Sequence, residues 1–328
     1  MKMADQLFKL LIFIQLLLSP CFAVDSLRFL VMGDWGGLPV HPYKTSIESG
    51  TAKGMADLTS RYGTQFNLAL GDNFYYKGVK SVNDHRFKKT FEKVFAYKDL
   101  QKTPFYLIAG NHDHKGNVSA QIAYSKVDSR WNFPDYYYKL QFGIPGSKML
   151  VDIVMIDTIV LCGNSDDDFL GLQPPGPENQ KLADDQLTWI EKQLQMSKAS
   201  YLLVSGHYPV YSIAEHGPTD CLLDKLLPLL QKYKVTAYFS GHDHNLQHLL
   251  VTKPGLKMNF FVSGGANFAD TSNAHKDNVP SGSSKFFWAE ESQHGGFAYV
   301  ETLTTNMTFT FVNGESKNLY QTVMYPRL

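Results

Sequence analysis

Residues 27 to 37 read LRFLVMGDWGG, and this segment sets a pattern for the whole chain. Its run of β-prone, mostly apolar residues predicts a short strand that is buried on both faces. The glycine after the run lets the chain turn sharply, and Asp34 is the first polar residue beyond it. The same order recurs in FNLALGDNFYY (66–76), FYLIAGNHDH (105–114), YLLVSGHYP (201–209) and AYFSGHDH (237–244).

The polar residues beyond these glycines are of types that bind metal ions: Asp34, Asp72, Asn111, His207, His242 and His244. In α/β proteins, ligands bind at the carboxyl ends of the strands, so we expect these side chains to converge. This mixed oxygen and nitrogen set is too large for one ion. It predicts two metal ions about 3.5–4 Å apart that clamp a phosphoryl group. Asp72 is the best candidate for a bridging carboxylate, because its two oxygens can each serve one ion.

The segments between these strands predict helices. Apolar residues recur at three- and four-residue spacing in 51–62, 83–95, 184–196 and 221–233. Pro228 should kink or break the last of these helices. The alternation of strand, helix and strand predicts parallel sheet with helices packed outside it.

The C-terminal third follows a different pattern. MNFFVSGGAN (258–267), GGFAYVETL (295–303) and MTFTFVNG (307–314) alternate strands with turns and favour antiparallel pairing. VDIVMIDTIVL (151–161) is also strand-like. The expected fold is therefore α/β, with two facing mixed β-sheets flanked by helices on both outer sides.

Length and composition favour one large domain. The chain has 328 residues, of which 44% are hydrophobic and 13% aromatic, so a large core can form. Lys plus Arg equals Asp plus Glu at 31 each, so no net charge favours binding to nucleic acid or anionic lipid. Because no segment is rich enough in Pro, Gly or Ser to divide domains, we expect residues 24–328 to form a single domain.

The first 23 residues are a different kind of segment. Lys2 and Lys9 precede the apolar stretch 10–18, and 21–23 (CFA) offers small residues where a signal peptidase cleaves. This order predicts a cleaved secretory signal over residues 1–23. The alternative is a membrane anchor, but the apolar stretch is shorter than the roughly 20 residues that a span needs. The protein is expected to be secreted, lysosomal or both.

In a secreted protein, two cysteines can form a disulfide and two sequons can be glycosylated. Cys162 and Cys221 remain after cleavage, and in an oxidising compartment such a pair usually bonds to itself; two buried free thiols are the alternative. Asn117 and Asn306 begin sequons and are candidate glycosylation sites. A glycan on Asn117 must point away from the nearby Asn111 cluster.

The motifs GDWGG, GDNFYY, GNHDH, GHYP and GHDH resemble those of the calcineurin-like metallophosphoesterases. Within that superfamily the chain resembles the purple acid phosphatases, and most closely their small monomeric animal members of the tartrate-resistant type. The resemblance runs from Leu27 to the C-terminus. Tyr75, three residues after Asp72, distinguishes this group, which uses a phenolate to bind ferric iron. The resemblance implies the four-layer metallophosphoesterase sandwich.

The resemblance also implies a role for each ligand. Asp34, Tyr75 and His244 would bind Fe(III), Asp72 would bridge, and Asn111, His207 and His242 would bind a divalent ion, which can be Fe(II), Zn(II) or Mn(II). The chemistry agrees, because a phenol with a pKa near 10 ionises in acid only beside a strong Lewis acid.

The implied reaction is hydrolysis of a phosphate monoester, in a phosphoprotein or a small phosphate, by direct attack of metal-bound hydroxide. His112 and His216 match histidines that contact phosphate and help to protonate the leaving group; alternatively, one of them only orients a ligand or a loop. His114 and Asp243 are expected to be supports rather than ligands. The rival functions are an iron carrier, a redox protein producing reactive oxygen species, and a manganese enzyme cleaving diesters or nucleotides, which Tyr75 disfavours.

The segment 163–179 (GNSDDDFLGLQPPGPEN) is acidic, contains several Pro and Gly residues, and is long for a connection. It begins directly after Cys162, and its acidic run Asp166–Asp168 can reach a positively charged centre. We expect this loop to cover part of the site and to restrain turnover until it is cut, as in the tartrate-resistant family, whose loop is proteolytically processed. The alternative is a solvated loop without a regulatory role.

Overall fold

The computed structural model describes residues 25–165, 173–253, 256–291 and 294–327. The expected signal segment and the acidic run Asp166–Asp168 therefore lie outside the described residues. Within the ranges that are described, the helices are too short or too polar to cross a membrane.

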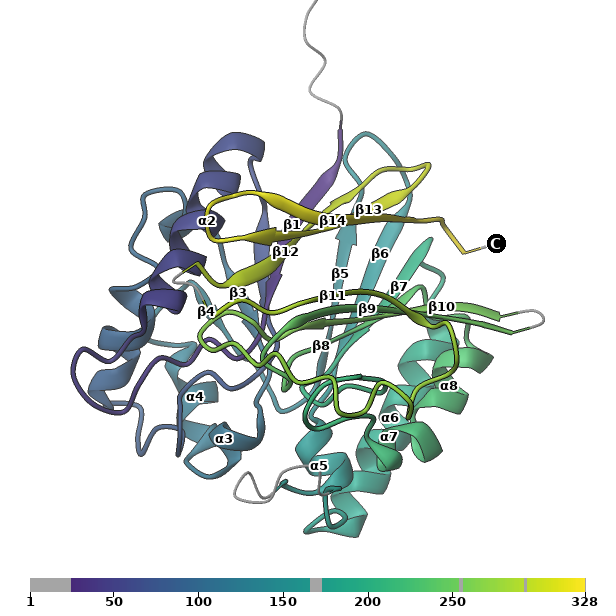
Figure 1. Cartoon of the computed structure of the whole chain (residues 1–328), viewed down its shortest axis with the longest axis horizontal. Helices are drawn as coiled ribbons and strands as arrows, with labels where there is room; N and C mark the ends of the chain where they lie inside the picture. The colour runs from purple at the N-terminus through teal and green to yellow at the C-terminus, as the bar shows by residue number, and fades with distance from the viewer. Residues whose placement is uncertain (1–24, 166–172, 254–255, 292–293, 328) are drawn as a thin grey trace, which may run out of the picture.

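Two seven-stranded sheets form the centre of the molecule (Figure 1). The first has the order β14 (Asn318–Met324), β13 (Met307–Asn313), β12 (Gly296–Thr302), β1 (Leu27–Met32), β2 (Phe66–Ala69), β3 (Phe105–Leu107) and β4 (Trp131–Asn132). The second has the order β11 (Ser284–Trp288), β9 (Leu246–Lys253), β10 (Leu256–Ser263), β8 (Ala237–Ser240), β7 (Tyr201–Ser205), β6 (Leu150–Met155) and β5 (Tyr138–Gly143).

Both sheets are mixed. The runs β1-β2-β3-β4 and β6-β7-β8-β10 pair in parallel. Strands β12, β13 and β14 extend the first sheet by antiparallel pairing, and β9, β11 and β5 do the same in the second. The prediction of two facing mixed sheets, with antiparallel strands in the C-terminal third, is confirmed.

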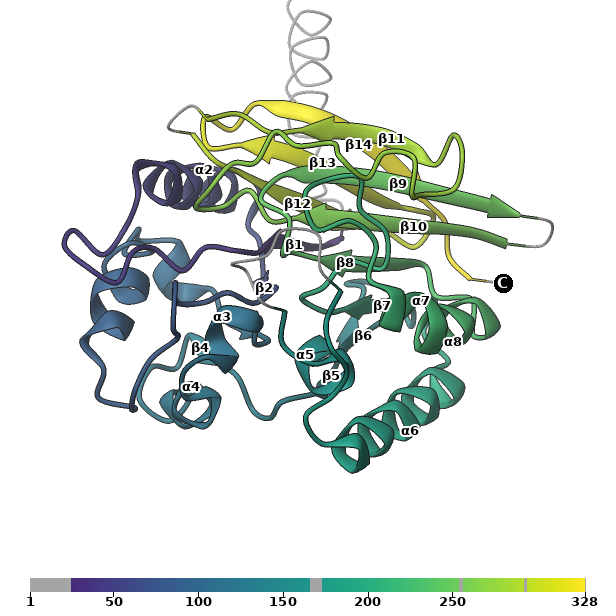
Figure 2. The same ribbon diagram turned by 60° about the horizontal axis from the view of Figure 1, so that its bottom comes forward.

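Helices cover the outer sides of the sheets. They are α2 (Ser46–Tyr62), α3 (Asn111–His114), α4 (Val118–Tyr124), α5 (Thr158–Cys162), α6 (Gln180–Met196), α7 (Asp220–Lys225) and α8 (Leu227–Lys232), with a π-helical turn η1 (Phe87–Glu92) and a 3₁₀ turn η2 (Leu100–Lys102). Figures 1 and 2 show α2, α3 and α4 on the side of the first sheet and α6, α7 and α8 on the side of the second.

Several helices begin before the predicted residue because a side chain caps their first turn. α2 begins at Ser46 because the Thr45 hydroxyl accepts a hydrogen bond from the backbone N–H of Glu48 (2.9 Å). The helix expected at 221–233 is two helices, since Pro228 lies in the first turn of α8, and the predicted break is confirmed. The helix expected at 83–95 is shorter than predicted: residues 85–92 are helical, and η1 forms most of this stretch. Just before it, Asp84 accepts from the backbone N–H of Arg86 (3.0 Å).

The strand expected at 151–161 is also wrong in its second half. β6 ends at Met155 and α5 begins at Thr158. The cause is Asp157, whose carboxylate accepts hydrogen bonds from the backbone N–H groups of Ile159 (3.0 Å) and Val160 (2.9 Å). An N-cap of this kind satisfies the first donors of a helix, so β-prone residues continue as a helical turn that ends at Cys162.

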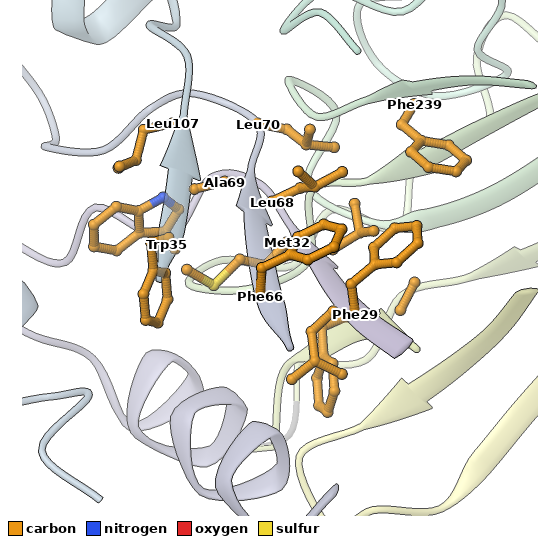
Figure 3. Packing of buried hydrophobic residues seen from close by; sticks show 14 of the residues in the cluster. Phe29, Met32, Trp35, Phe66, Leu68, Ala69, Leu70, Leu107 and Phe239 are labelled. Carbon is orange, nitrogen blue, oxygen red and sulfur yellow. The ribbon is translucent and has the colours of Figure 1, made fainter. Parts of the chain in front are cut away.

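The core fills the space between the sheets and beneath the loops that follow β1 and β2 (Figure 3). Phe29 of β1 and Phe66 of β2 stack at 4.7 Å and are fully buried, as the continuous apolar runs predict. Trp35, the residue after Asp34, is also fully buried, and its ring packs edge-on against Phe95 at 5.5 Å. Burying such a side chain contributes about 1.5–3 kcal/mol, so the loop that carries Asp34 is held by core packing.

Candidate metal centre

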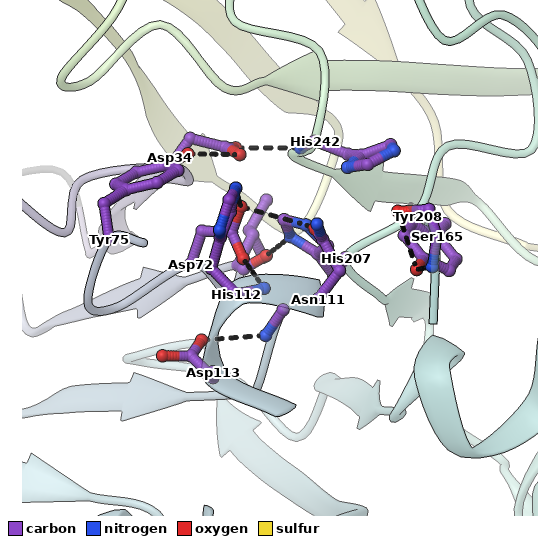
Figure 4. A network of polar contacts seen from close by, with 12 residues as sticks. Asp34, Asp72, Tyr75, Asn111, His112, Asp113, Ser165, His207, Tyr208 and His242 are labelled. Atoms are coloured by element: carbon purple, nitrogen blue, oxygen red, sulfur yellow. Dashed lines mark hydrogen bonds and ion pairs between the residues drawn. The ribbon is translucent and has the colours of Figure 1, made fainter. Parts of the chain in front are cut away.

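The polar residues beyond the parallel strands meet at one place between the two sheets (Figure 4). The first sheet contributes the residues after β1, β2 and β3, and the second contributes the residues after β7 and β8. They are Asp34, Asp72, Asn111, His207, His242 and His244. The ligand atoms of Asp34, Asp72 and His207 all lie within 4.8 Å of one another, and together these buried side chains can hold a metal ion.

Three of these residues have strained backbone. Asp34, Asp72 and His242 have φ angles of 58°, 51° and 72°, in the left-handed region that favours glycine. Each such residue costs on the order of 1–3 kcal/mol and persists only where its surroundings hold it in place. Left-handed backbone at three strand ends aims these side chains inward, and such strain is concentrated at functional sites.

One half of the site contains the phenol. The Tyr75 hydroxyl donates to Asp34 Oδ1 (3.1 Å) and lies 2.9 Å from His244 Nε2. His244 Nε2 is 3.7 Å from the same Asp34 oxygen. Tyr75 is only 1% exposed, so its hydroxyl contacts ligands rather than solvent.

The other half is centred on His207. His207 Nε2 lies 2.8 Å from Asn111 Oδ1 and 3.5 Å from Asp72 Oδ2, and its Nδ1 is 2.9 Å from the carbonyl oxygen of Leu70, which orients the ring. The His242 ring packs against the His207 ring at 5.1 Å. Asp72 therefore faces the ligands of this half, while its neighbour Asp34 belongs to the half with Tyr75.

A pocket of about 560 Å³ opens onto both halves. Its walls are formed by Asp72, Tyr75, Tyr76, Lys77, Asn111, His112, Lys115, Glu215, His216, His242, His244 and Phe268. His112 and His216, expected at the phosphate, both line this pocket, whereas Asp34 and His207 are completely buried.

The electrostatics of the protein alone disfavour charge on two oxygen ligands, Asp34 and Tyr75, and favour charge on Asp72. Burial, and then the charge of Asp72, raise the pKa of Asp34, although His207 opposes them. Burial and the charges of Asp34 and Asp72 raise the pKa of the Tyr75 phenol. Burial would also raise the pKa of Asp72, but His207 and His112 outweigh it and lower that pKa.

The donor set fits multivalent cations. Two carboxylates and a phenol buried together repel one another when ionised, and a metal ion reverses that repulsion. Burial lowers the pKa of His244 to about 4 and that of His242 well below its usual value. Both rings are therefore neutral, the form in which imidazole binds a metal.

A buried network joins the loops that carry the ligands. Asp113 accepts from the backbone N–H groups of Asn73 (3.0 Å) and Gly110 (2.9 Å) and from the Gln121 side chain (2.7 Å). The Asn73 side chain in turn accepts from the Trp35 indole (3.0 Å). The residues beside Asp34, Asp72 and Asn111 thus belong to one hydrogen-bonded unit.

His114 and Asp243, which we expected to be supports, each take part in a contact between a histidine and a carboxylate. His216 Nδ1 lies 2.9 Å from Asp243 Oδ1, which also accepts from the His216 backbone N–H (3.0 Å). Burial would raise the pKa of Asp243, but hydrogen bonding and charge from His216 lower it. His114 Nε2 lies 2.7 Å from Asp157, the cap of α5. A carboxylate held against a ring nitrogen fixes the orientation of each histidine.

A disulfide joins Cys162 and Cys221, so that prediction is confirmed. It ties the end of α5 to the first turn of α7. The described ends of the loop 163–179 lie beside the site: the Asn164 side chain donates to the carbonyl oxygen of Asn111 (3.1 Å), and Gln173 donates to the carbonyl oxygen of Pro218 (2.9 Å).

The structure thus brings together every metal-ligand and histidine position that the sequence predicts. Sequence reasoning missed the residues that position them. Asn73 and Asp113 lie inside the motifs GDNF and GNHD, which could have identified them. Gln121 and Arg86 belong to no motif, and their contacts become visible only in the fold.

Comparison with known proteins shows the family to which the chain belongs. The calcineurin-like phosphoesterase family model matches residues 27–246. The chain is 50% identical to tartrate-resistant acid phosphatase type 5 of Homo sapiens over 315 residues, covering 95% of this chain and 96% of that protein. The Arabidopsis thaliana purple acid phosphatase 7 is 33% identical over 74% of this chain and 71% of its own length.

Solved structures show a similar fold. The purple acid phosphatase PPD1 from yellow lupin (Lupinus luteus) seeds matches with a TM-score of 0.63 and 16% identity, over 92% of this chain and 54% of that chain. GAP50, described as the anchor in the inner membrane complex of Plasmodium, matches with a TM-score of 0.77 and 24% identity, over 92% of this chain and 90% of that chain.

Proposed function

This chain belongs to the calcineurin-like phosphoesterase family and is an acid phosphatase, and we propose that it hydrolyses phosphate monoesters at a dinuclear Fe(III)–M(II) centre. The observation that carries the proposal is the contact of the buried Tyr75 hydroxyl with both Asp34 and His244. A phenol in this place is a ligand for a hard, highly charged ion, because burial and two carboxylates otherwise oppose its ionisation.

In this proposal Asp34, Tyr75 and His244 hold Fe(III), and Asn111, His207 and His242 hold the divalent ion, which is iron, zinc or manganese. Asp72 would be shared by the two ions: one of its oxygens accepts from the backbone N–H of His112 (3.0 Å), and the other lies 3.5 Å from His207 Nε2. When bound, the two ions supply a hydroxide nucleophile in acid and offset the charge of the phosphoryl oxygens. The remaining chemistry belongs to side chains of the pocket.

His112 and His216 are the proposed phosphate contacts. His112 is held by its Nδ1, 2.8 Å from the carbonyl oxygen of Tyr76, and His216 is held by Asp243. A histidine that donates a proton to the leaving oxygen lowers the barrier in acid. No Ser or Cys nucleophile is required, because the attack on phosphorus is direct.

The test of the proposed centre is metal analysis combined with a visible absorption spectrum. We expect two metal ions per chain, one of them iron, and a purple or pink protein with acid phosphatase activity. A colourless, fully active protein that holds two divalent ions would contradict the ferric assignment.

Replacing His216 by Gln should lower kcat by about 10²-fold or less and change the limb of the pH profile on which activity falls as pH rises, because a protonated donor is lost. The measurement is kcat for a monoester across the acidic range. His275→Gln is the matched control, since His275 bonds a backbone carbonyl (Ala214, 2.7 Å) and lies outside the pocket. A His216 variant with the wild-type profile would assign His216 a structural role.

Cutting the loop 163–179 should raise activity. Its described ends are bonded beside the pocket, Asn164 to the carbonyl oxygen of Asn111 and Gln173 to that of Pro218. Limited proteolysis should increase kcat/KM while the fragments stay joined by the Cys162–Cys221 disulfide until reductant is added. Unchanged kinetics after complete cleavage would leave a solvated loop without a regulatory role.

The disulfide and the N-terminal sequence support a secretory route to the lysosome, the medium or both, with cleavage of residues 1–23. We place residues 24–328 in one catalytic domain that acts as a monomer. Asn117 is exposed, and its side-chain oxygen caps α4 by accepting from Ala120 (2.9 Å). Glycosylation there and at Asn306 stays a prediction.

A further inference from the structure

A buried arginine joins the two loops that carry the proposed ferric ligands. Arg86 is 5% exposed, and its guanidinium donates through Nη1 to the carbonyl oxygen of Tyr75 and through Nη2 to that of Gly36 (2.5 Å). We propose that Arg86 is a positioning residue that fixes the Tyr75 phenol against Asp34 for ferric binding. This inference rests on the proposed function, because it concerns the geometry of the same centre.

The two loops already meet at these carbonyl groups. The backbone N–H of Tyr75 donates to the carbonyl oxygen of Gly36 (3.1 Å), so that oxygen accepts from both Tyr75 and Arg86. The approach is so close that a Cβ on Gly36 would lie 2.5 Å from the backbone nitrogen of Phe74. We call the two hydrogen bonds from Arg86 to these carbonyl groups the clamp. Gly36 is two residues beyond Asp34, and the clamp therefore sets the distance between the Asp34 and Tyr75 side chains.

A buried acid, Glu48, lies near the turn that Arg86 binds. Glu48 of α2 is completely buried, and neither of its carboxylate oxygens, nor Nε of Arg86, has a hydrogen-bond partner among the described residues. Burial raises the pKa of Glu48, and the charge of Arg86 is the main influence that opposes this rise. A Cβ on Gly37 would lie 3.1 Å from Glu48 Oε2, which places this carboxylate at the turn that Arg86 binds. Burial lowers the pKa of Arg86 to about 10, and the charges of Asp84 and then of Glu48 oppose this change.

The planar, forked guanidinium group of arginine is suited to binding these two carbonyl groups. Its donors point in fixed directions and reach two carbonyl groups at once, whereas a lysine offers one compact charge. The guanidinium also lies over the Phe74 ring, with its carbon 5.3 Å from the ring centroid. Loss of the fork leaves Tyr75 free to rotate away from Asp34 and His244.

The experiment compares Arg86→Met with wild type in iron affinity, measured by competition with a chelator, and in visible absorbance per bound iron. Outer contacts of metal ligands are typically worth 10–100-fold in metal affinity. We therefore expect iron affinity to fall by about 10–100-fold and the phenolate band to shift or weaken. Thermal unfolding of each variant shows that it is folded.

Arg130→Met is the matched control. Arg130 also donates to a backbone carbonyl (Phe95, 2.9 Å) and lies over an aromatic ring (Phe91, 4.7 Å), but it contacts neither metal loop. Its loss should lower stability without changing the band or the iron affinity. Equal effects of the two substitutions on the band would overturn the clamp.

Arg86→Lys keeps the charge without the fork and serves if Arg86→Met does not fold. It should lie between wild type and Arg86→Met in iron affinity; a wild-type value would overturn the clamp, because charge alone would then suffice. A colourless wild-type protein would instead refute the ferric centre itself, so the two failures are distinguishable.

Discussion

Replacing Tyr75 by Phe should remove the visible absorption band of the iron-loaded protein. The band of a ferric phenolate arises from charge transfer, and phenylalanine has no oxygen to donate. Tyr75 is 1% exposed and Phe fills almost the same space, so the substitution deletes only the hydroxyl and its contacts with Asp34 and His244. The loss should therefore be confined to the centre, and the fold should survive.

The measurement is absorbance per bound iron, with thermal unfolding as a check of the fold. Tyr201→Phe is the control, because Tyr201 is an equally buried tyrosine at the start of β7 whose hydroxyl donates to a backbone carbonyl (Leu303, 3.0 Å). The control should keep its colour. A Tyr75→Phe protein that retains the wild-type band would assign the colour to another ligand.

The second large effect is expected from Asp72→Asn. The change preserves shape but removes the negative charge and one oxygen of the proposed bridge. Metal binding should weaken, and the metal ions are what would stabilise the charge of the phosphoryl group. A metal ion contributes several kcal/mol to such a reaction. A loss of about 4 kcal/mol corresponds to about 10³-fold in kcat, and chelation of both metals should abolish activity.

The assay measures kcat together with metal content. Asp152→Asn is the control: Asp152 is also completely buried and pairs with Lys139 (2.7 Å), but it lies within β6 away from the metal loops. It should lose stability and keep its metals. Near-normal kcat in Asp72→Asn would rule out a bridging role for this carboxylate.

The sequence predicts the site better than it predicts the helices around it. The ligands are predictable because parallel strands deliver the residues beyond their carboxyl ends to one edge, whatever their separation in the chain. The turn into α5 is not, because β-prone residues follow Asp157 and only its cap makes them helical. The strand β4 is two residues long, too short to leave a pattern.

The sequence does not reveal the residues that position the ligands, such as Arg86 and Glu48, for another reason. Arg86 binds carbonyl oxygens of Gly36 and Tyr75, and backbone oxygen is present at every position, so no pairing of side chains reveals the contact. Glu48 resembles any acid in the first turn of a helix. Such positions are set by the three-dimensional approach of loops, which local periodicity does not encode.

The division of the ligands between the sheets has a mechanical consequence. Asp34, Asp72 and Asn111 come from one sheet, and the histidines come from the other. In the proposed centre, ions bound between them would join the two sheets, and separating the sheets would require breaking coordination bonds. A ligand that binds only the folded state adds RT ln(1 + [L]/Kd) to stability, about 4 kcal/mol at a thousandfold excess over Kd. Under the proposed function, metal supply in the compartment where the chain folds would therefore change the free energy of unfolding of the enzyme.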